Sequence, residues 1–232
     1  MAKARARPAR RRRRAPSVEK RARAAEVLDR LEVAMPDVRI ALDFGTDLEL
    51  LVSVVLSAQS TDAGVNKATP ALFKAFPDAT AYARARPEEL WPYIRTLGLY
   101  RNKAKAIVAA AQAIAAGHDG KVPRTRDALE ALPGVGRKTA GVVLVHLGAG
   151  LAFPVDTHVG RVSRRLDFTR EEDPDRVEED LRALFPEERW AKGHQLLVWH
   201  GRRTCDALRP ACSRCPVESL CPKRGTPRAM RR

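Results

Sequence analysis

The stretch LPGVGRKTAGVVL, at residues 132–144, decides the fold. Pro133 stops a helix expected to end near Leu132, and Gly134 and Gly136 allow backbone conformations and close approaches that other residues resist. A second helix is expected to begin near Gly136. The amide groups of the turn and the positive end of that helix then face outward together, which suits a phosphate oxygen. Two glycines between helices also suit an ordinary tight turn, so this motif alone leaves both interpretations open.

Helix signals recur along the rest of the chain. Thr46 and Glu49 have the spacing of a capping box, and the apolar run at 48–58 predicts a helix buried on every side. Other signals mark further helix starts, stops or bodies, at Pro87, Gly98, 102–116, Thr125, Asp173 and 188–200. No segment combines the period-two alternation of a strand with flanking hairpin turns, so the sequence predicts an all-α fold.

Positive charge is concentrated at the two ends of the chain. The formal charge of the 232 residues is +15, and residues 1–23 carry eleven Lys and Arg against one Glu. Residues 222–232 carry five more basic residues and no acidic one, so residues 24–221 are formally neutral. We expect residues 1–17 to form a disordered basic arm that contacts phosphates, and residues 225–232 to form a basic tail. A solubilising tail or an organelle transit peptide is the alternative for the arm.

The apolar residues are sufficient for a core but not for a membrane protein. They make up 44% of the chain. No uninterrupted apolar stretch approaches the roughly 18 residues that a membrane span needs. The sequence therefore excludes an integral membrane protein.

Two charged residues at helix starts suggest chemistry. Lys138 is expected in the first turn of the second hairpin helix, where the positive helix end disfavours the ammonium form. Partial burial would further favour the neutral amine that a nucleophile requires. Asp156, in PVDTHVGRV at 154–162, precedes a helical stretch and suits an ordinary N-cap. A carboxylate facing a neutral amine is nevertheless the pair needed for displacement at a sugar carbon.

All four cysteines fall within 17 residues, which indicates that they act as a set. Cys205, Cys212, Cys215 and Cys221 follow the pattern C-x6-C-x2-C-x5-C. Two disulfides would suit an oxidising compartment, whereas metal ligation suits an intracellular protein that faces nucleic acid. Four thiolates fit either a structural zinc ion or an iron-sulfur cluster. The nearby His194 and His200 are expected to be helix residues or to support the ligands.

The hairpin, the aspartate motif and the cysteine pattern, in this order, resemble endonuclease III, of the helix-hairpin-helix DNA glycosylase superfamily. The likeness includes LLVSVVLSAQSTDAGVNKAT at 50–69 and IRTLGLYRNKAKAI at 94–107, and it covers about residues 19–224.

The resemblance implies a two-lobed, all-α helix-hairpin-helix glycosylase fold. A six-helix lobe at 40–150 would contain the hairpin. Residues 18–39 and 151–224 would form a second lobe with a C-terminal [4Fe-4S] cluster loop.

Individual residues match the family's functional positions. Lys138 matches the nucleophilic lysine, and Asp156 matches the catalytic aspartate. Gln59 matches the residue that fills the gap left by an extruded nucleotide, and Leu99 matches the apolar wedge on the opposite strand. The remaining matches are DNA contacts by Gly134, Gly136, Arg137 and His158, and cluster ligation by Cys205, Cys212, Cys215 and Cys221.

The implied activity is that of a bifunctional DNA glycosylase and AP lyase. Such an enzyme extrudes an oxidised pyrimidine from the duplex, excises it through a Schiff base on Lys138, and nicks the strand 3′ to the abasic site by β-elimination. The resemblance further implies a partner, which is double-stranded DNA with a damaged pyrimidine or an abasic site. It also implies a monomer in the bacterial cytoplasm, associated with the nucleoid.

Two alternative functions compete with this one. An adenine mismatch glycosylase relative carries a similar cluster and aspartate, but it typically lacks the hairpin lysine and has an additional C-terminal domain. A non-catalytic helix-hairpin-helix DNA-binding paralogue would grip phosphates without chemistry. Phosphate binding requires neither Lys138 nor Asp156, and this argues against the second alternative.

Overall fold

The computed structural model describes residues 15–148 and 152–226, and every regular element in these ranges is a helix. Residues 1–14 of the expected basic arm and residues 227–232 of the expected tail lie outside the described residues. The described end of the arm leads directly into a helix, because the Ser17 hydroxyl caps α1 by accepting from the Lys20 amide. No helix in the described ranges is long and apolar enough to cross a membrane.

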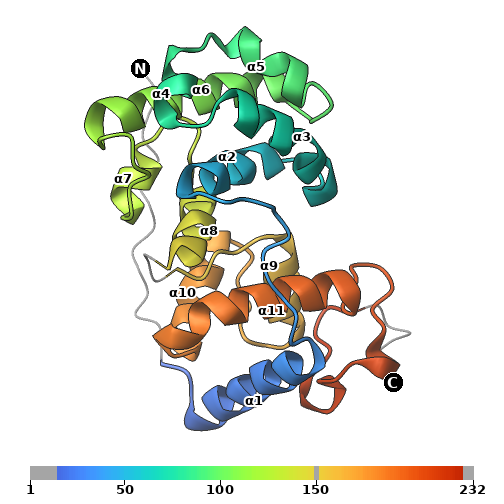
Figure 1. Cartoon of the computed structure of the whole chain (residues 1–232). Helices are drawn as coiled ribbons and strands as arrows, with labels where there is room; N and C mark the ends of the chain where they lie inside the picture. Colours follow the sequence, from blue (N-terminus) through green and yellow to red (C-terminus); the bar gives the residue numbers. More distant parts are fainter. Residues whose placement is uncertain (1–14, 149–151, 227–232) are drawn as a thin grey trace, which may run out of the picture.

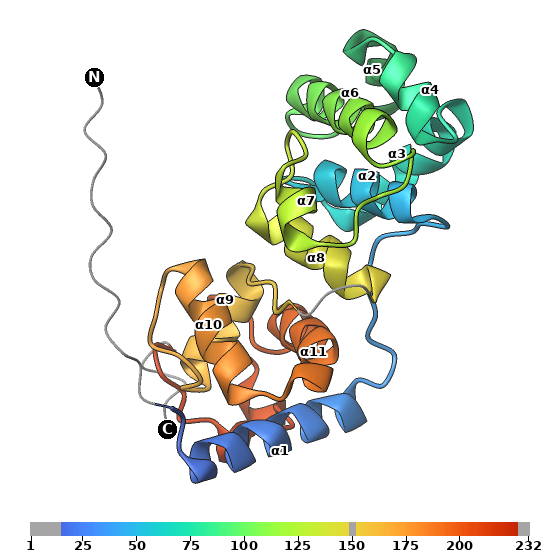
Figure 2. The ribbon, with the colours of Figure 1, turned by 90° about the vertical axis from the view of Figure 1, so that its left-hand side faces the viewer.

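The helices form two groups, each with its own hydrophobic core (Figures 1 and 2). We call the first group the hairpin lobe; it contains α2 (Asp47–Ser57), α3 (Asp62–Ala75), α4 (Ala79–Arg84), α5 (Pro87–Ile94), α6 (Tyr100–Gly117), α7 (Arg126–Glu130) and α8 (Arg137–Leu147). We call the second group the cysteine lobe; it contains α1 (Val18–Ala34), α9 (Thr157–Arg165), α10 (Pro174–Leu184), α11 (Trp190–Arg203) and the 3-10 turns Glu187–Arg189, Cys212–Arg214 and Glu218–Leu220. Within the described residues the hairpin lobe has seven helices, where the resemblance implies six.

Helix α2 is the central helix of the hairpin lobe, as its apolar run predicts. All seven residues from 50 to 56 are buried. The Thr46 hydroxyl accepts from the Glu49 amide, which is one half of the predicted capping box. The Glu49 carboxylate accepts from the amide of Gly45 instead of Thr46, so the second half is displaced by one residue. The helix start is fixed by both contacts.

Helix α1 completes the cysteine lobe from the opposite end of the sequence. It lies along α11 (Figure 1), and its buried residues Ala24, Val27, Leu28 and Leu31 share a core with residues 153–217. The Arg23 guanidinium donates to the Leu220 carbonyl over 2.9 Å, which ties α1 to the cysteine-bearing segment. The cysteine lobe is therefore built from both ends of the described chain.

The two glycines of the hairpin turn have different structural roles. Gly134 has φ +77°, and a Cβ there would lie 2.4 Å from the Ala106 Cβ on α6. Only glycine combines this left-handed conformation with so close an approach. Gly136 has φ −86° and is the N-cap of α8, and a Cβ there would meet no atom within 4 Å. Gly134 is required for packing, whereas Gly136 leaves open space in front of the helix.

We predict that Gly134→Ala lowers the free energy of unfolding by about 2–4 kcal/mol, because it adds left-handed strain to a clash with α6. The matched variant Gly136→Ala loses only the better N-cap residue and costs about 1 kcal/mol or less. Urea unfolding followed by circular dichroism measures both values. Equal destabilisation by the two variants would contradict the contact between the turn and α6.

Candidate active site

A cavity of about 280 Å³ brings together residues of both lobes. Lys138 on α8 and Asp156 at the start of α9 line this cavity, as does Gln59 in the loop after α2. The other lining residues include Ile40, Leu42, Val54, Asp62, Thr139, Val142, His146, His194, Trp199 and Arg202. Residues that are distant in the sequence thus share one cavity at the boundary between the lobes.

Lys138 is the second residue of α8 and lies in its first turn, as the sequence predicts. Lys138 is exposed, so the partial burial considered above is absent. The apolar packing of α8 begins only at Ala140, so the first turn projects beyond the hairpin core. The ammonium group therefore reaches the cavity from a solvent-accessible helix end, where unpaired amides also favour an anion.

Asp156 is the N-cap of α9. Its Oδ1 accepts from the Val159 amide over 2.7 Å, so the capping interpretation from the sequence is confirmed. The same side chain lines the cavity with Lys138. The cap fixes the orientation of the carboxylate, and the two interpretations of this residue are therefore compatible.

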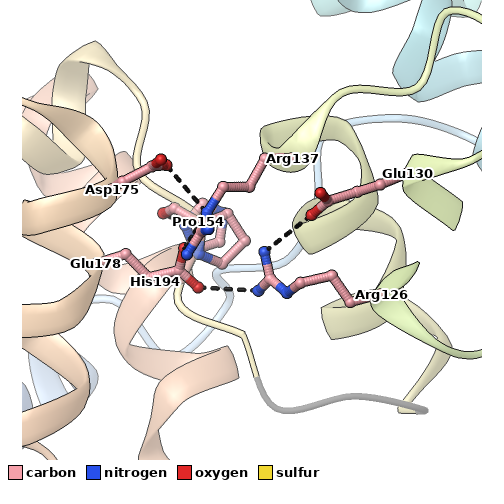
Figure 3. Close-up of polar contacts among 7 residues, drawn as sticks. All are labelled: Arg126, Glu130, Arg137, Pro154, Asp175, Glu178 and His194. Carbon is pink, nitrogen blue, oxygen red and sulfur yellow. Dashed lines mark hydrogen bonds and ion pairs between the residues drawn. The ribbon is translucent and has the colours of Figure 1, made fainter. Parts of the chain in front are cut away.

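Two histidines of the cavity stay neutral. The His194 Nδ1 lies 2.8 Å from the Pro154 carbonyl oxygen (Figure 3), so this nitrogen carries the proton and Nε2 is left as an acceptor. Burial lowers the pKa of His194, although the charge of Asp156 partly opposes this shift. Burial, and then the neighbouring His194, lower the pKa of His146 to about 4. The two rings therefore add polarity without positive charge beside Lys138.

Sequence analysis missed His146, although a signal for it exists. Lys138, Val142 and His146 are separated by four residues each, which places them on one face of α8. All three line the cavity. Extending this spacing along the helix from the predicted nucleophile identifies the histidine.

The loops that carry Gln59 and Leu99 lie against each other. A Cβ on Gly98 would lie 2.9 Å from the Gln59 carbonyl oxygen. Gln59 and Leu99 both have left-handed backbones, with φ +53° and +58°, which is uncommon for residues other than glycine. The Leu99 side chain is 53% exposed although it is large and apolar. Both side chains are therefore presented at the surface by strained backbone that the surrounding structure must maintain.

A buried lysine supports these two loops and was not identified from the sequence. Lys103, in the first turns of α6, donates its Nζ to the Leu56 carbonyl and to the Ser60 hydroxyl, each over 2.8 Å. Burial lowers the pKa of Lys103. Its position in the Ala-rich run at 102–116 resembles that of a surface lysine, so only the tertiary structure reveals the contact.

The remaining two residues predicted to contact DNA, His158 and Arg137, contact other residues of this chain. The His158 Nδ1 lies 3.2 Å from the Arg161 guanidinium, and the ring packs against Gly201. His158 is close to Asp156 in sequence but is not among the residues that line the cavity. The Arg137 guanidinium faces Asp175 and Glu178 of α10, as Figure 3 shows.

The four cysteines line one small cavity in the cysteine lobe. All four are free thiols and partly buried. Burial raises the pKa of Cys215 to about 11, and the other three sulfurs are close enough to affect it. Within residues 15–148 and 152–226, no three His, Cys, Asp or Glu side chains converge closely enough to hold a single metal ion. The four thiols therefore share one partly buried site.

Comparison with known proteins agrees with this geometry. Residues 52–187 match the family model described as HhH-GPD superfamily base excision DNA repair protein. Endonuclease III of Synechocystis is 45% identical over 204 residues, which are 88% of this chain and 93% of that protein. Endonuclease III of Escherichia coli is 42% identical over 201 residues, which are 87% of this chain and 95% of that protein.

Solved structures give the same result. A trapped covalent intermediate of endonuclease III with DNA has a TM-score of 0.83 and 42% identity, and the match covers 88% of this chain and 96% of that chain. A thermostable thymine-DNA glycosylase has a TM-score of 0.76 at 23% identity, so it supports the fold alone. The chain therefore belongs to the endonuclease III family, within the HhH-GPD superfamily of base excision DNA repair proteins.

Proposed function

We propose that this protein excises oxidised pyrimidines from double-stranded DNA and then cleaves the strand, with Lys138 as the nucleophile and Asp156 as its catalytic partner. The family accounts for the bifunctional DNA glycosylase and AP lyase activity. The observation that supports the residue roles is the cavity at the lobe boundary, which Lys138 and Asp156 enter from different lobes. A module that only binds phosphates needs no such pair.

In the proposed reaction, the Lys138 ammonium group first gives up a proton, and the neutral amine then attacks C1′ of the damaged nucleotide. A bond forms between Nζ and C1′, and the damaged base leaves with the electrons of the glycosidic bond. Opening of the sugar gives a Schiff base, and β-elimination then breaks the bond to the 3′ phosphate. Asp156 manages charge and protons in these steps, and its cap to Val159 holds the carboxylate in place.

We assign recognition of the lesion to the two loops that carry Gln59 and Leu99. Gln59 would fill the gap left by the extruded nucleotide, and Leu99 would enter the stack from the opposite strand. Their left-handed backbones and the contact at Gly98 support this assignment, because both side chains project from a rigid pair of loops. The open space in front of Gly136 suits a phosphate at the start of α8.

We further propose that Cys205, Cys212, Cys215 and Cys221 hold a [4Fe-4S] cluster. The common cavity of the four thiols and the similarity to endonuclease III over most of the chain support this proposal. Four cysteine ligands leave no open position on the cluster, so its contribution would be structural. Arg165 supports this site by donating to the Cys205 sulfur and to the Asp206 and Ala207 carbonyls.

The proposed enzyme acts as a monomer on the nucleoid in the bacterial cytoplasm. Both members of the catalytic pair come from one chain, so the site needs no second copy. The adenine mismatch alternative is disfavoured by Lys138 and by the similarity to endonuclease III over most of the chain.

Lys138→Gln is expected to abolish both base excision and covalent trapping by borohydride, because the variant has no amine to form the Schiff base. The assay uses a duplex with one thymine glycol and a denaturing gel. DNA affinity should change little, and Lys74→Gln, at an exposed lysine on α3 away from the cavity, should behave as the wild type. Nicking of the thymine glycol strand by Lys138→Gln would show that another group is the nucleophile.

Asp156→Asn is expected to slow single-turnover excision by about 100-fold or more while leaving the melting temperature nearly unchanged, because asparagine caps a helix as well as aspartate. Asp156→Ala should lose the cap as well, at about 1 kcal/mol of stability. Thermal unfolding and single-turnover kinetics separate the two effects. Wild-type rates for Asp156→Asn would show that Asp156 acts only as the N-cap of α9.

The purified protein is expected to be brown and to contain about four iron atoms per chain. Cys212→Ser should lower the iron content and the broad visible absorption, and it should destabilise the cysteine lobe. Elemental analysis with inorganic sulfide determination provides the test. One zinc ion per chain without sulfide would contradict the cluster.

A further inference from the structure

A buried carboxylate of the cysteine lobe holds both helices of the hairpin. Glu178, on α10, is 5% exposed. Its Oε1 accepts from the Arg126 guanidinium of α7 over 2.9 Å, and its Oε2 accepts from the Arg137 guanidinium of α8 over 3.3 Å. Figure 3 shows the two arginines reaching Glu178 from the hairpin side.

Each arginine also has a second, more exposed carboxylate partner. Glu130, on the same helix as Arg126, lies 3.6 Å from it. Asp175, one turn before Glu178 on α10, lies 3.0 Å from Arg137. Glu178 differs from both because it is buried and because it contacts the two helices at once. Two charge-assisted contacts hold this buried carboxylate, and its removal would leave both guanidiniums with only their more exposed partners.

The position of this contact matters because the catalytic pair is divided between the lobes. Lys138 follows Arg137 directly in the first turn of α8, and Asp156 caps α9 in the cysteine lobe. Any shift of the hairpin relative to α10 therefore changes the position of the amine relative to the carboxylate. The rate of a reaction between positioned groups is sensitive to displacements of about 1 Å.

A second pair between the lobes does not replace this contact. Arg202 of α11 lies 2.7 Å from Asp62 of α3, at another wall of the cavity. That pair joins the lobes through α3 and leaves α7 and α8 unattached. Within residues 15–148 and 152–226, the ion pairs at Glu178 and Asp175 connect α10 to the hairpin itself.

We propose that Glu178 is a positioning residue for the reaction, which anchors the hairpin to α10 and thereby places Lys138 opposite Asp156. The proposal rests on the function proposed above for these two residues. It also assigns Arg137 to the anchor, where the family likeness suggests a DNA contact. Glu178 itself touches neither the substrate nor the reacting atoms.

Amide hydrogen exchange tests the anchor without reference to activity. Glu178→Gln keeps the size of the side chain but removes its charge, so amides of the hairpin at 133–140 should exchange at least about tenfold faster. Glu130→Gln removes the other partner of Arg126 within the hairpin lobe and serves as the matched control, with exchange at 133–140 close to the wild type. Unchanged exchange in Glu178→Gln would overturn the anchor, whether or not the protein is a glycosylase.

Single-turnover kinetics tests the effect on catalysis. At saturating thymine glycol duplex, Glu178→Gln should excise the base roughly 10- to 100-fold more slowly, with a Kd for DNA within about threefold of the wild type. Glu130→Gln should retain both values. Faster exchange with an unchanged excision rate would overturn the positioning role, whereas an inactive wild type would contradict the proposed function and leave the exchange result standing.

Arg137→Gln provides a second route to the same contact if Glu178→Gln fails to fold. It removes the α8 side of the anchor at a half-exposed position, and it should reproduce the slow excision at saturating DNA. The double variant should be no slower than the slower single variant, because both act through one contact. Additive losses of excision rate in the double variant, or a higher Kd for DNA with an unchanged rate at saturation, would assign Arg137 to DNA binding and overturn the proposal.

Discussion

The contact between the hairpin turn and α6 is the constraint on which the site depends. Because Gly134 has no side chain, the turn backbone rests directly on Ala106, and this fixes where α8 begins. The start of α8 in turn fixes the first turn that carries Lys138, and the four-residue spacing along the helix places His146 deeper in the same cavity. The absence of a Cβ at Gly134 thus determines how the face of α8 that carries Lys138 and His146 meets the other lobe.

The distribution of charge in the cavity follows from a difference in solvent exposure between Lys138 and the two histidines. Lys138 lies at an exposed helix end, whereas His194 is buried and His146 is partly buried, and both rings are neutral. The two rings therefore contribute only hydrogen-bonding capacity, and positive charge in the cavity comes from Lys138 and from the guanidiniums of Arg39 and Arg202. A protonated histidine in the same place would compete for Asp156 and for the phosphates of an incoming strand.

Local features of the site could be predicted from the sequence, and tertiary contacts could not. Features that depend on residues close in the sequence leave recognisable patterns, as in the hairpin turn, the Thr46 and Asp156 caps and the buried α2. Glu178 and Lys103 each sit in an ordinary polar or Ala-rich helix, and their partners lie more than 40 residues away. The exposure of Lys138 could not be predicted either, because it depends on how the lobes meet.

The origin of the cysteine lobe from both ends of the chain has a consequence for biosynthesis. On a ribosome, α1 emerges before the other described helices, but most of the core that its buried face joins is made more than a hundred positions later. The hairpin lobe, whose core comes from residues 42–144, can be completed while α1 still lacks a partner. During synthesis the middle of the chain can therefore fold before its beginning, and closing the cysteine lobe costs the larger loop-closure entropy.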